Sequence, residues 1–73
     1  MINLGNKIKS LSSLEEGIIT NIDLWDDEES LSTGNHGVIE IKITNIGESQ
    51  YLEIGDVEYY SYLGWDKCFK IIG

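Results

Sequence analysis

The chain has 73 residues, and thirteen Asp and Glu against five Lys and no Arg give it a formal net charge of -8. This length predicts a single domain over residues 1–73. The only cysteine, Cys68, excludes a disulfide within the chain. With His36 as the only histidine, the ligand set of a zinc site is missing as well. We therefore expect no metal and no cofactor.

Apolar residues are spread along the chain rather than gathered into one long run. No stretch reaches the roughly 20 apolar residues of a membrane-spanning helix. Residues 1–9 lack the apolar centre of a signal peptide. Together with the single thiol, these features predict a cytoplasmic protein that does not bind a membrane.

The charge also limits the class of partner. Affinity for nucleic acid comes mainly from phosphates neutralised by Lys and Arg, so we expect no direct binding of nucleic acid. A strongly acidic protein is attracted to basic surfaces, which favours a basic protein partner. The alternative is that the acidity only keeps a small domain soluble.

The first expected element is a strand within residues 2–11, interrupted near Gly5 and Asn6. Residues 13–16, with the sequence Ser-Leu-Glu-Glu, are typical of the capping box that begins a helix. Gly17 follows at once and favours a helix end. We expect at most one short helical turn near the N-terminus.

Two longer strands follow, at residues 17–25 and 38–46. In the first strand, alternation predicts two mixed faces, made by Ile18, Thr20, Ile22 and Leu24 and by Ile19, Asn21, Asp23 and Trp25. The second strand alternates more regularly and reads as half-buried, with one face made by Ile39, Ile41 and Ile43 and the other by Glu40, Lys42 and Thr44.

The segment between these strands, at about 26–37, is predicted to be a long acidic loop. It opens with four carboxylates and continues with Ser, Thr, Gly and Asn residues. Loops of this length in a small domain tend to be functional or disordered.

The last third of the chain predicts three short strands, at residues 51–54, 57–63 and 67–72. Gly55-Asp56 and residues 64–66 supply the turn signals between them. Short, evenly spaced strands predict a mostly β fold. We expect a small antiparallel five- or six-stranded barrel or sheet of the SH3-like or OB-like size class.

The acidic loop is the first candidate binding site, and its residues are Trp25, Asp26, Asp27, Glu28 and Glu29. The carboxylates would steer a basic partner toward the site, and the tryptophan would anchor it. The alternative is a solvated loop whose tryptophan packs into the core. No calcium site is expected, because the spacing of the acids does not match an EF-hand loop.

The second candidate is an acidic and aromatic patch made by Glu53, Asp56, Glu58, Tyr60 and Tyr62. Tyrosine is enriched at protein interfaces. Tyr60 and Tyr62 share one strand face and Tyr59 lies on the other. Either Tyr59 is buried and the other two are on the surface, or the reverse holds. The alternative for all of them is an ordinary core with cross-strand pairs.

No constellation typical of an enzyme is present. Cys68 is predicted to lie mid-strand as a small apolar residue, and His36 to lie in a solvated turn. The chain has neither a phosphate-binding loop nor a serine elbow. A barrel of this size also offers little room for a substrate pocket.

These observations predict a non-enzymatic acidic binding protein that occupies a basic surface on a partner protein. The form we expect is an inhibitor or regulator of a nucleic-acid-binding enzyme, by mimicry of nucleic acid. Phage or mobile-element proteins with anti-defence or immunity roles belong to this class. The alternative is a small homo-oligomeric structural or assembly module, for which a homodimer is the simplest form.

Overall fold

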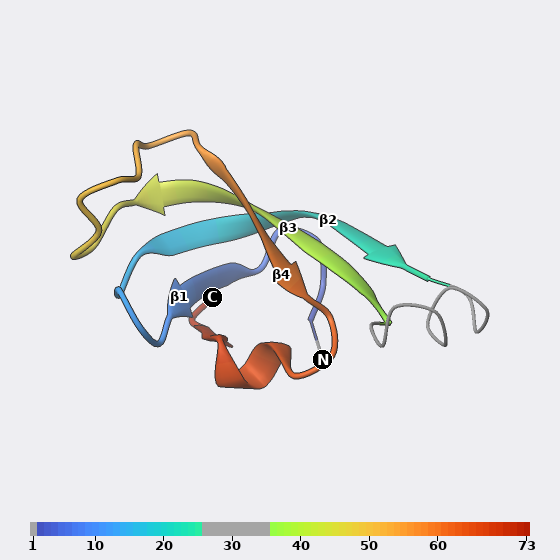
Figure 1. The fold of residues 1–73 in the computed structure, drawn as a ribbon. Helices are drawn as coiled ribbons and strands as arrows, with labels where there is room; N and C mark the ends of the chain where they lie inside the picture. Colours follow the sequence, from blue (N-terminus) through green and yellow to red (C-terminus); the bar gives the residue numbers. More distant parts are fainter. Residues whose placement is uncertain (1, 26–35) are drawn as a thin grey trace.

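The computed structural model describes residues 2–25 and 36–73, which form an antiparallel sheet and one 3-10 turn (Figure 1). The elements are β1 (Lys7–Ser10), β2 (Glu16–Leu24), β3 (Gly37–Asn45), β4 (Val57–Ser61), η1 (Trp65–Lys67) and β5 (Phe69–Ile71). The predicted mostly β fold with five or six antiparallel strands is confirmed. The expected helical region near the N-terminus contains only a non-helical turn, and η1 lies near the C-terminus instead.

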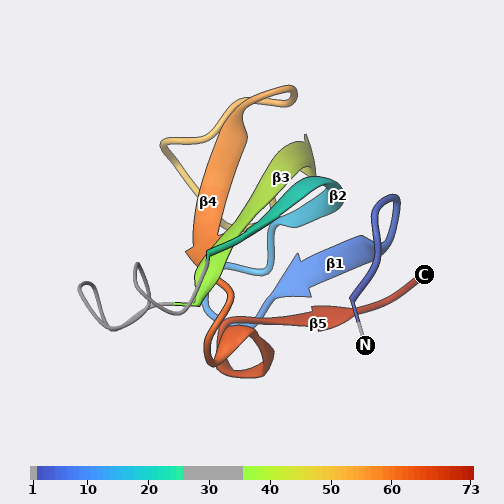
Figure 2. The ribbon, with the colours of Figure 1, turned by 90° about the vertical axis from the view of Figure 1, so that its right-hand side faces the viewer.

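The sheet order is β4-β3-β2-β1-β5, so four strands form a meander and β5 returns to the free side of β1. β1 pairs only with the first part of β2, whereas β3 pairs with β2 along the whole length of β2. β2 therefore belongs to two leaves of a strongly bent sheet, which Figure 2 shows at a steep angle to each other. This meander differs from the Greek key of an OB-like barrel.

The core lies in the angle between the two leaves. Ile39, Ile41 and Ile43 are at most 1% exposed, so the predicted alternation of β3 is confirmed. The remaining buried apolar residues come from the other leaf and its neighbours, and they are Ile2, Ile8, Ile19 and Phe69. β-branched side chains suit such a pleated, packed surface.

β2 departs from the predicted alternation at Thr20, which has no partner in β3 and forms a β-bulge. The neighbouring pairs are Ile19↔Ile41, Asn21↔Glu40 and Ile22↔Ile39. Ile19 and Ile22 therefore both contact the core, although strict alternation places them on opposite faces. The prediction is wrong here because the extra residue, Thr20, moves each later side chain of β2 to the opposite face of the sheet.

The C-terminal third contains two strands where three were predicted. Residues 51–54 form no strand; they belong to a turn that docks on the end of β3. The amide of Gly55 donates to the Ile43 carbonyl at 2.8 Å, and the Ile43 amide donates to the Asp56 carbonyl at 2.7 Å. These bonds replace the tight hairpin that Gly55-Asp56 was expected to close.

η1 lies on the concave side of the bent sheet, below the arch in Figure 1. Trp65 of η1 stacks on Phe69 with ring centroids 5.3 Å apart, and Tyr60 of β4 meets Phe69 edge-on at 5.2 Å. This aromatic contact ties β4 to β5, the two strands at opposite ends of the sheet order. Cys68 ends η1 and is exposed, so the prediction that it lies mid-strand as a small apolar residue is wrong.

Candidate functional site

The first predicted site falls largely on residues 26–29, which lie outside the described residues. Its remaining member, Trp25, is half-buried at the end of β2, and its amide donates to the His36 carbonyl at 2.9 Å. This bond continues the β2–β3 ladder by one pair beyond the strands. Trp25 is not among the residues that pack on the core cluster.

Two members of the second predicted site, Glu53 and Asp56, form one turn before β4. The Asp56 carboxylate accepts the Glu53 amide at 2.9 Å, and the Asp56 amide donates to the Glu53 carbonyl at 3.0 Å. The Asp56 side chain therefore serves the turn itself, as short polar side chains commonly do. The Glu53 side chain is exposed.

The other three members, Glu58, Tyr60 and Tyr62, lie on the inner side of β4 and its extension. Glu58 and Tyr60 pair with core residues of β3. Tyr60 and Tyr62 are half-buried and pack against the core cluster. The question left open by the sequence is therefore resolved: Tyr59 is the outward tyrosine and is 66% exposed.

The predicted residues thus occupy separate places along the sheet. Trp25 and Tyr62 both lie near Gly37, at the start of β3. Glu53 and Asp56 lie near Ile43, toward its end. Six residues of strand separate the two groups by roughly 20 Å, and Glu58 and Tyr60 lie between them on the inner face.

The outer face of the β4-β3-β2 leaf carries the carboxylate of Glu40. The sequence analysis placed Glu40 on one face of its strand but did not include it in a candidate site. Glu40 of β3 accepts the Thr20 hydroxyl at 2.8 Å on one carboxylate oxygen and the Tyr59 hydroxyl at 3.4 Å on the other. The donors come from the strands on either side and both are neutral. Glu40 therefore accepts a hydrogen bond from each of the two neighbouring strands.

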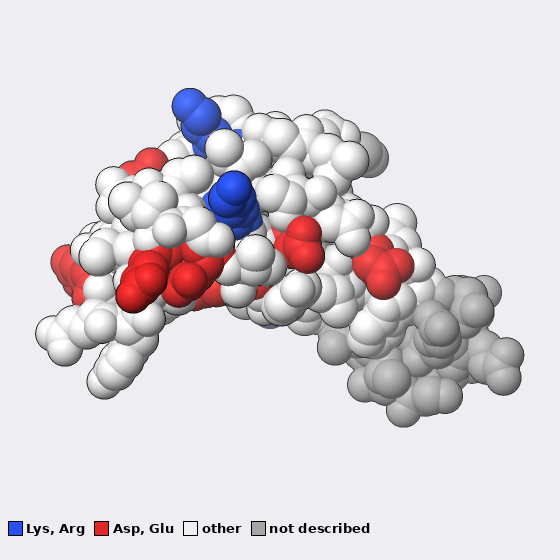
Figure 3. Space-filling model, turned by 90° about the horizontal axis from the view of Figure 1, so that it is seen from above, with Lys and Arg blue, Asp and Glu red and all other residues white. Residues whose placement is uncertain are grey.

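We call this surface the Glu40 face. It includes outward residues of three strands, namely Ile18, Thr20, Asn21, Asp23, Val38, Glu40, Lys42, Val57 and Tyr59. Figure 3 views the molecule from above the arch and shows carboxylates spread across this side, with lysines between them. Charged groups and an exposed aromatic ring thus share one continuous strand surface.

Thr20, Glu40 and Tyr59 were not predicted as site residues, because their proximity becomes evident only once the pairing of the strands is known. Tyr59 and Glu40 are direct cross-strand partners, and such pairs interact on a shared face. Thr20 reaches the same carboxylate only because of the bulge, which no local sequence pattern predicts.

The inner face of the sheet holds a second polar cluster, around the hydroxyl of Tyr60. This hydroxyl lies 2.8 Å from an oxygen of Glu58 and 3.3 Å from an oxygen of Glu15. Glu15 is only 4% exposed. Burial raises the pKa of the Tyr60 hydroxyl well above its ordinary value, and the hydrogen-bonded carboxylate of Glu58 raises it further.

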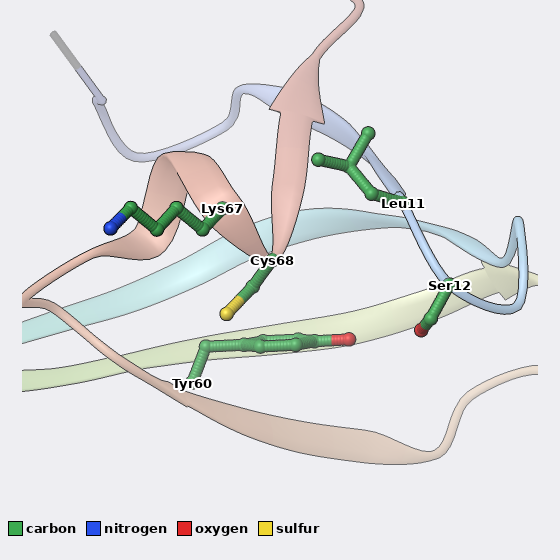
Figure 4. Close-up of a pocket in the computed structure, with 5 residues that line it drawn as sticks. All are labelled: Leu11, Ser12, Tyr60, Lys67 and Cys68. Carbon is green, nitrogen blue, oxygen red and sulfur yellow. The ribbon is translucent and has the colours of Figure 1, made fainter.

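A cleft of about 350 Å³ opens beside this cluster. Its lining comes from the β1–β2 turn, β4 and the end of η1, and comprises Leu11, Ser12, Tyr60, Lys67 and Cys68. Figure 4 shows the Tyr60 ring edge-on, with Cys68 on one side of its plane and its hydroxyl pointing toward Ser12. The Lys67 ammonium points away from the ring in the same view.

Neither cluster has the composition of a metal centre. Within residues 2–25 and 36–73, no three His, Cys, Asp or Glu side chains converge as a metal site would require. Within the same ranges, no helix is long and apolar enough to cross a membrane.

The features that bear on function are therefore an outer surface with two carboxylates, a lysine and an exposed tyrosine, and a small cleft lined in part by Tyr60. Comparisons of this chain with protein-family models, with curated proteins and with solved structures find no match.

Proposed function

We propose that this chain is a non-enzymatic binding protein that attaches to a basic surface of another protein through the Glu40 face. The observation that carries the proposal is the position of Glu40, whose two carboxylate oxygens accept hydrogen bonds from the neutral hydroxyls of Thr20 and Tyr59. A carboxylate fixed in advance loses little side-chain freedom on binding, so more of its attraction to a lysine or arginine appears as affinity.

The surroundings of Glu40 suit an interface of this kind. Tyr59 is 66% exposed beside it, and Val57 of the same strand is 46% exposed. Tyrosine contributes contact area and a hydroxyl at low entropic cost, which favours it in interfaces. Asp23, on the same face, precedes the acidic run Asp26–Glu29 by three positions, so the charge continues along the chain beyond β2.

The partner that fits best is a nucleic-acid-binding enzyme, which this chain would inhibit or regulate. A surface that binds phosphates must present lysine and arginine, and a chain of net charge -8 is attracted to the same surface. Competition with nucleic acid is then the simplest mode of inhibition. Glu53 is a further exposed carboxylate that this proposal includes. Trp25 and the run Asp26–Glu29 are included on the grounds of their sequence alone.

The test is capture of the partner from a native lysate at low salt, followed by its affinity for matched variants. Glu40→Gln keeps the shape of the side chain but removes its charge, and we expect affinity to fall about tenfold, or about 1.4 kcal/mol. Glu48→Gln is the control, because it makes the same charge change at an exposed turn. Equal loss in both variants would show that net charge, and not the Glu40 face, determines binding.

A second candidate function is a homo-oligomeric assembly module. The strand order leaves β4 and β5 at the two ends of the sheet, and an unpaired strand edge is a template for pairing with another chain. Mass measured in solution separates the two functions. A stable oligomer at micromolar concentration that captures no basic protein would favour assembly over the proposed binding function.

A further inference from the structure

We infer that one end of the molecule, where the β1–β2 turn packs on the loop after β3, docks into an apolar pocket of the basic partner protein, with lysine or arginine at the pocket rim. The inference rests on the proposed function, because it adds a second contact to the same partner. We call this surface the apolar end. Its exposed apolar residues are Leu14, Ile46, Tyr51 and Ile54.

The two segments of the apolar end are in direct contact. The Glu48 amide donates to the Ser13 carbonyl at 2.8 Å. Gly47 lies so close to the other turn that a Cβ there would be 2.5 Å from the backbone of Leu14. Both segments lie at the same end of the arch in Figure 1. Residues far apart in the sequence therefore contribute to one surface.

The loop after β3 is anchored on both sides of Tyr51, yet its largest side chain stays in water. The Ser49 hydroxyl oxygen accepts the Tyr51 amide at 3.3 Å, and Leu52 packs against the core cluster. Tyr51 is nevertheless 92% exposed, and Ile54 is 74% exposed. Exposed apolar groups that gather in one place mark interaction sites, and an exposed aromatic ring is a typical anchor of a protein interface.

Leu14 supplies an independent observation at the same end. Its φ is 63°, and within the described residues it is the only residue other than glycine with a positive φ. Leucine rarely adopts this conformation, which glycine or asparagine would adopt more easily. The leucine side chain is 40% exposed, so burial in the core does not explain its presence. Residues kept in unfavourable conformations are concentrated at functional sites.

The charges around the apolar end favour a pocket with a basic rim. Every charged residue between Lys42 and Lys67 is acidic. Glu48 and Glu53, which precede and follow Tyr51 in the chain, are both exposed. Such carboxylates attract lysine and arginine at the edge of a contact. A second copy of this chain or an anionic membrane would instead place negative charge against them.

The apolar end also adjoins the Glu40 face. Val57, an outward residue of that face, follows Ile54 by three positions and is 46% exposed. The Gly55 amide between them donates to the carbonyl of Ile43 in β3. One partner can therefore cover both surfaces, with the Glu40 face supplying charge and the apolar end supplying apolar contact area.

The first test uses a small host that imitates the inferred pocket. Amino-substituted β-cyclodextrin has an apolar cavity rimmed by ammonium groups, and carboxylated β-cyclodextrin has the same cavity with the opposite charge. Chemical-shift changes of the backbone amides locate binding on the full chain. We expect the amino host to shift residues 51–54 most and the carboxylated host to shift them little. Equal shifts at Tyr59, the other exposed tyrosine, would contradict a preference for the apolar end.

The second test measures the affinity of the captured partner for serine variants. Tyr51→Ser and Ile54→Ser should each lower affinity about tenfold. Leu4→Ser is the control, because it removes an apolar side chain that is 65% exposed outside the apolar end. At roughly 1 M salt, where the Debye length is about 3 Å, the effect of Glu40→Gln should shrink. The effects of the two serine variants should persist, since apolar contact does not depend on screening.

These outcomes separate the inference from the proposed function. Host binding at residues 51–54 without capture of any basic protein would support the apolar end as a contact surface and count against the proposed function. Capture that depends on Glu40 but is unchanged in Tyr51→Ser and Ile54→Ser would uphold the Glu40 face and overturn the inference. A dimer that Tyr51→Ser converts to a monomer would also overturn it, because a second copy would then cover the apolar end.

Discussion

Neighbouring residues of β4 have opposite surroundings, and each tyrosine there takes its properties from its face. Tyr59 is exposed and reaches Glu40 across the outer surface. Tyr60 faces the core, meets Phe69 and contacts two carboxylates. The candidate interface and the buried polar cluster thus contain consecutive residues of the chain, Tyr59 and Tyr60.

The Tyr60 hydroxyl predicts a loss of stability at alkaline pH. An unfolded tyrosine ionises near pH 10, whereas in the folded chain the pKa is raised well above that value. Above about pH 10 the unfolded chain therefore loses a proton that the folded chain retains, so the free energy of unfolding falls as pH rises. This contribution is complete below about pH 10.

Urea unfolding between about pH 8 and pH 11 measures this dependence. Tyr60→Phe should lower stability near neutral pH by about 1–3 kcal/mol, because two carboxylates lose their donor, and its alkaline decline should be shallower. Tyr51→Phe, at a residue 92% exposed, should keep the decline of the parent chain. Identical slopes for both variants would contradict the role assigned to Tyr60.

At the scale of elements, the bulge at Thr20 decides which residues of β2 reach the core. Deleting Thr20 leaves the pairs on both sides in register, because it has no partner of its own. We expect the cost to be about 1–2 kcal/mol, mainly from the lost hydrogen bond to Glu40. Deleting the exposed residue Lys42 instead breaks the alternation of β3 and should abolish cooperative unfolding. Thermal unfolding monitored by circular dichroism compares the two deletions.

A second prediction concerns two turns that pack on each other. Gly47 has φ +57°, and a Cβ there would lie 2.5 Å from the backbone of Leu14. Gly55 has φ +97° with no atom within 4 Å of such a Cβ. Gly55→Ala should therefore cost about 1 kcal/mol from backbone strain alone, and Gly47→Ala roughly 3 kcal/mol or more. Urea denaturation measures both, and equal costs would show that this turn contact does not constrain the fold.

At the scale of the whole molecule, the charge of -8 is expected to control how fast a basic partner is found. Replacing Asp26, Asp27, Glu28 and Glu29 by Asn and Gln should slow association and flatten its dependence on ionic strength, while stability changes little. The control neutralises Glu16, Glu48 and Asp66, and the two effects are compared per charge removed. Stopped-flow binding measures both rates; a smaller effect of the first set than of the second would refute a steering role for the acidic run.

Much of the fold follows from local pattern. The alternation in residues 38–46 is sufficient to predict β3 and its buried isoleucines, because a half-buried strand imposes a period of two. The short spacing between turn signals predicts five or six antiparallel strands, and five form in the described part of the chain. Residues 51–54 show the limit of this reasoning. This apolar run forms a turn, in which the Glu53 amide bonds to the Asp56 side chain and the following Gly55 amide bonds to Ile43 of β3.

The candidate site depends on tertiary structure to a greater degree. By itself, the sequence determined the composition of the molecule: its acidity, its lack of arginine and the grouping of aromatic residues near the C-terminus. Only the tertiary structure decided that Tyr60 is inside and Tyr59 outside, and that Thr20, Glu40 and Tyr59 meet. The physical reason is that a strand's two faces are equivalent until a neighbour packs on one of them, and register and bulges are set by that packing.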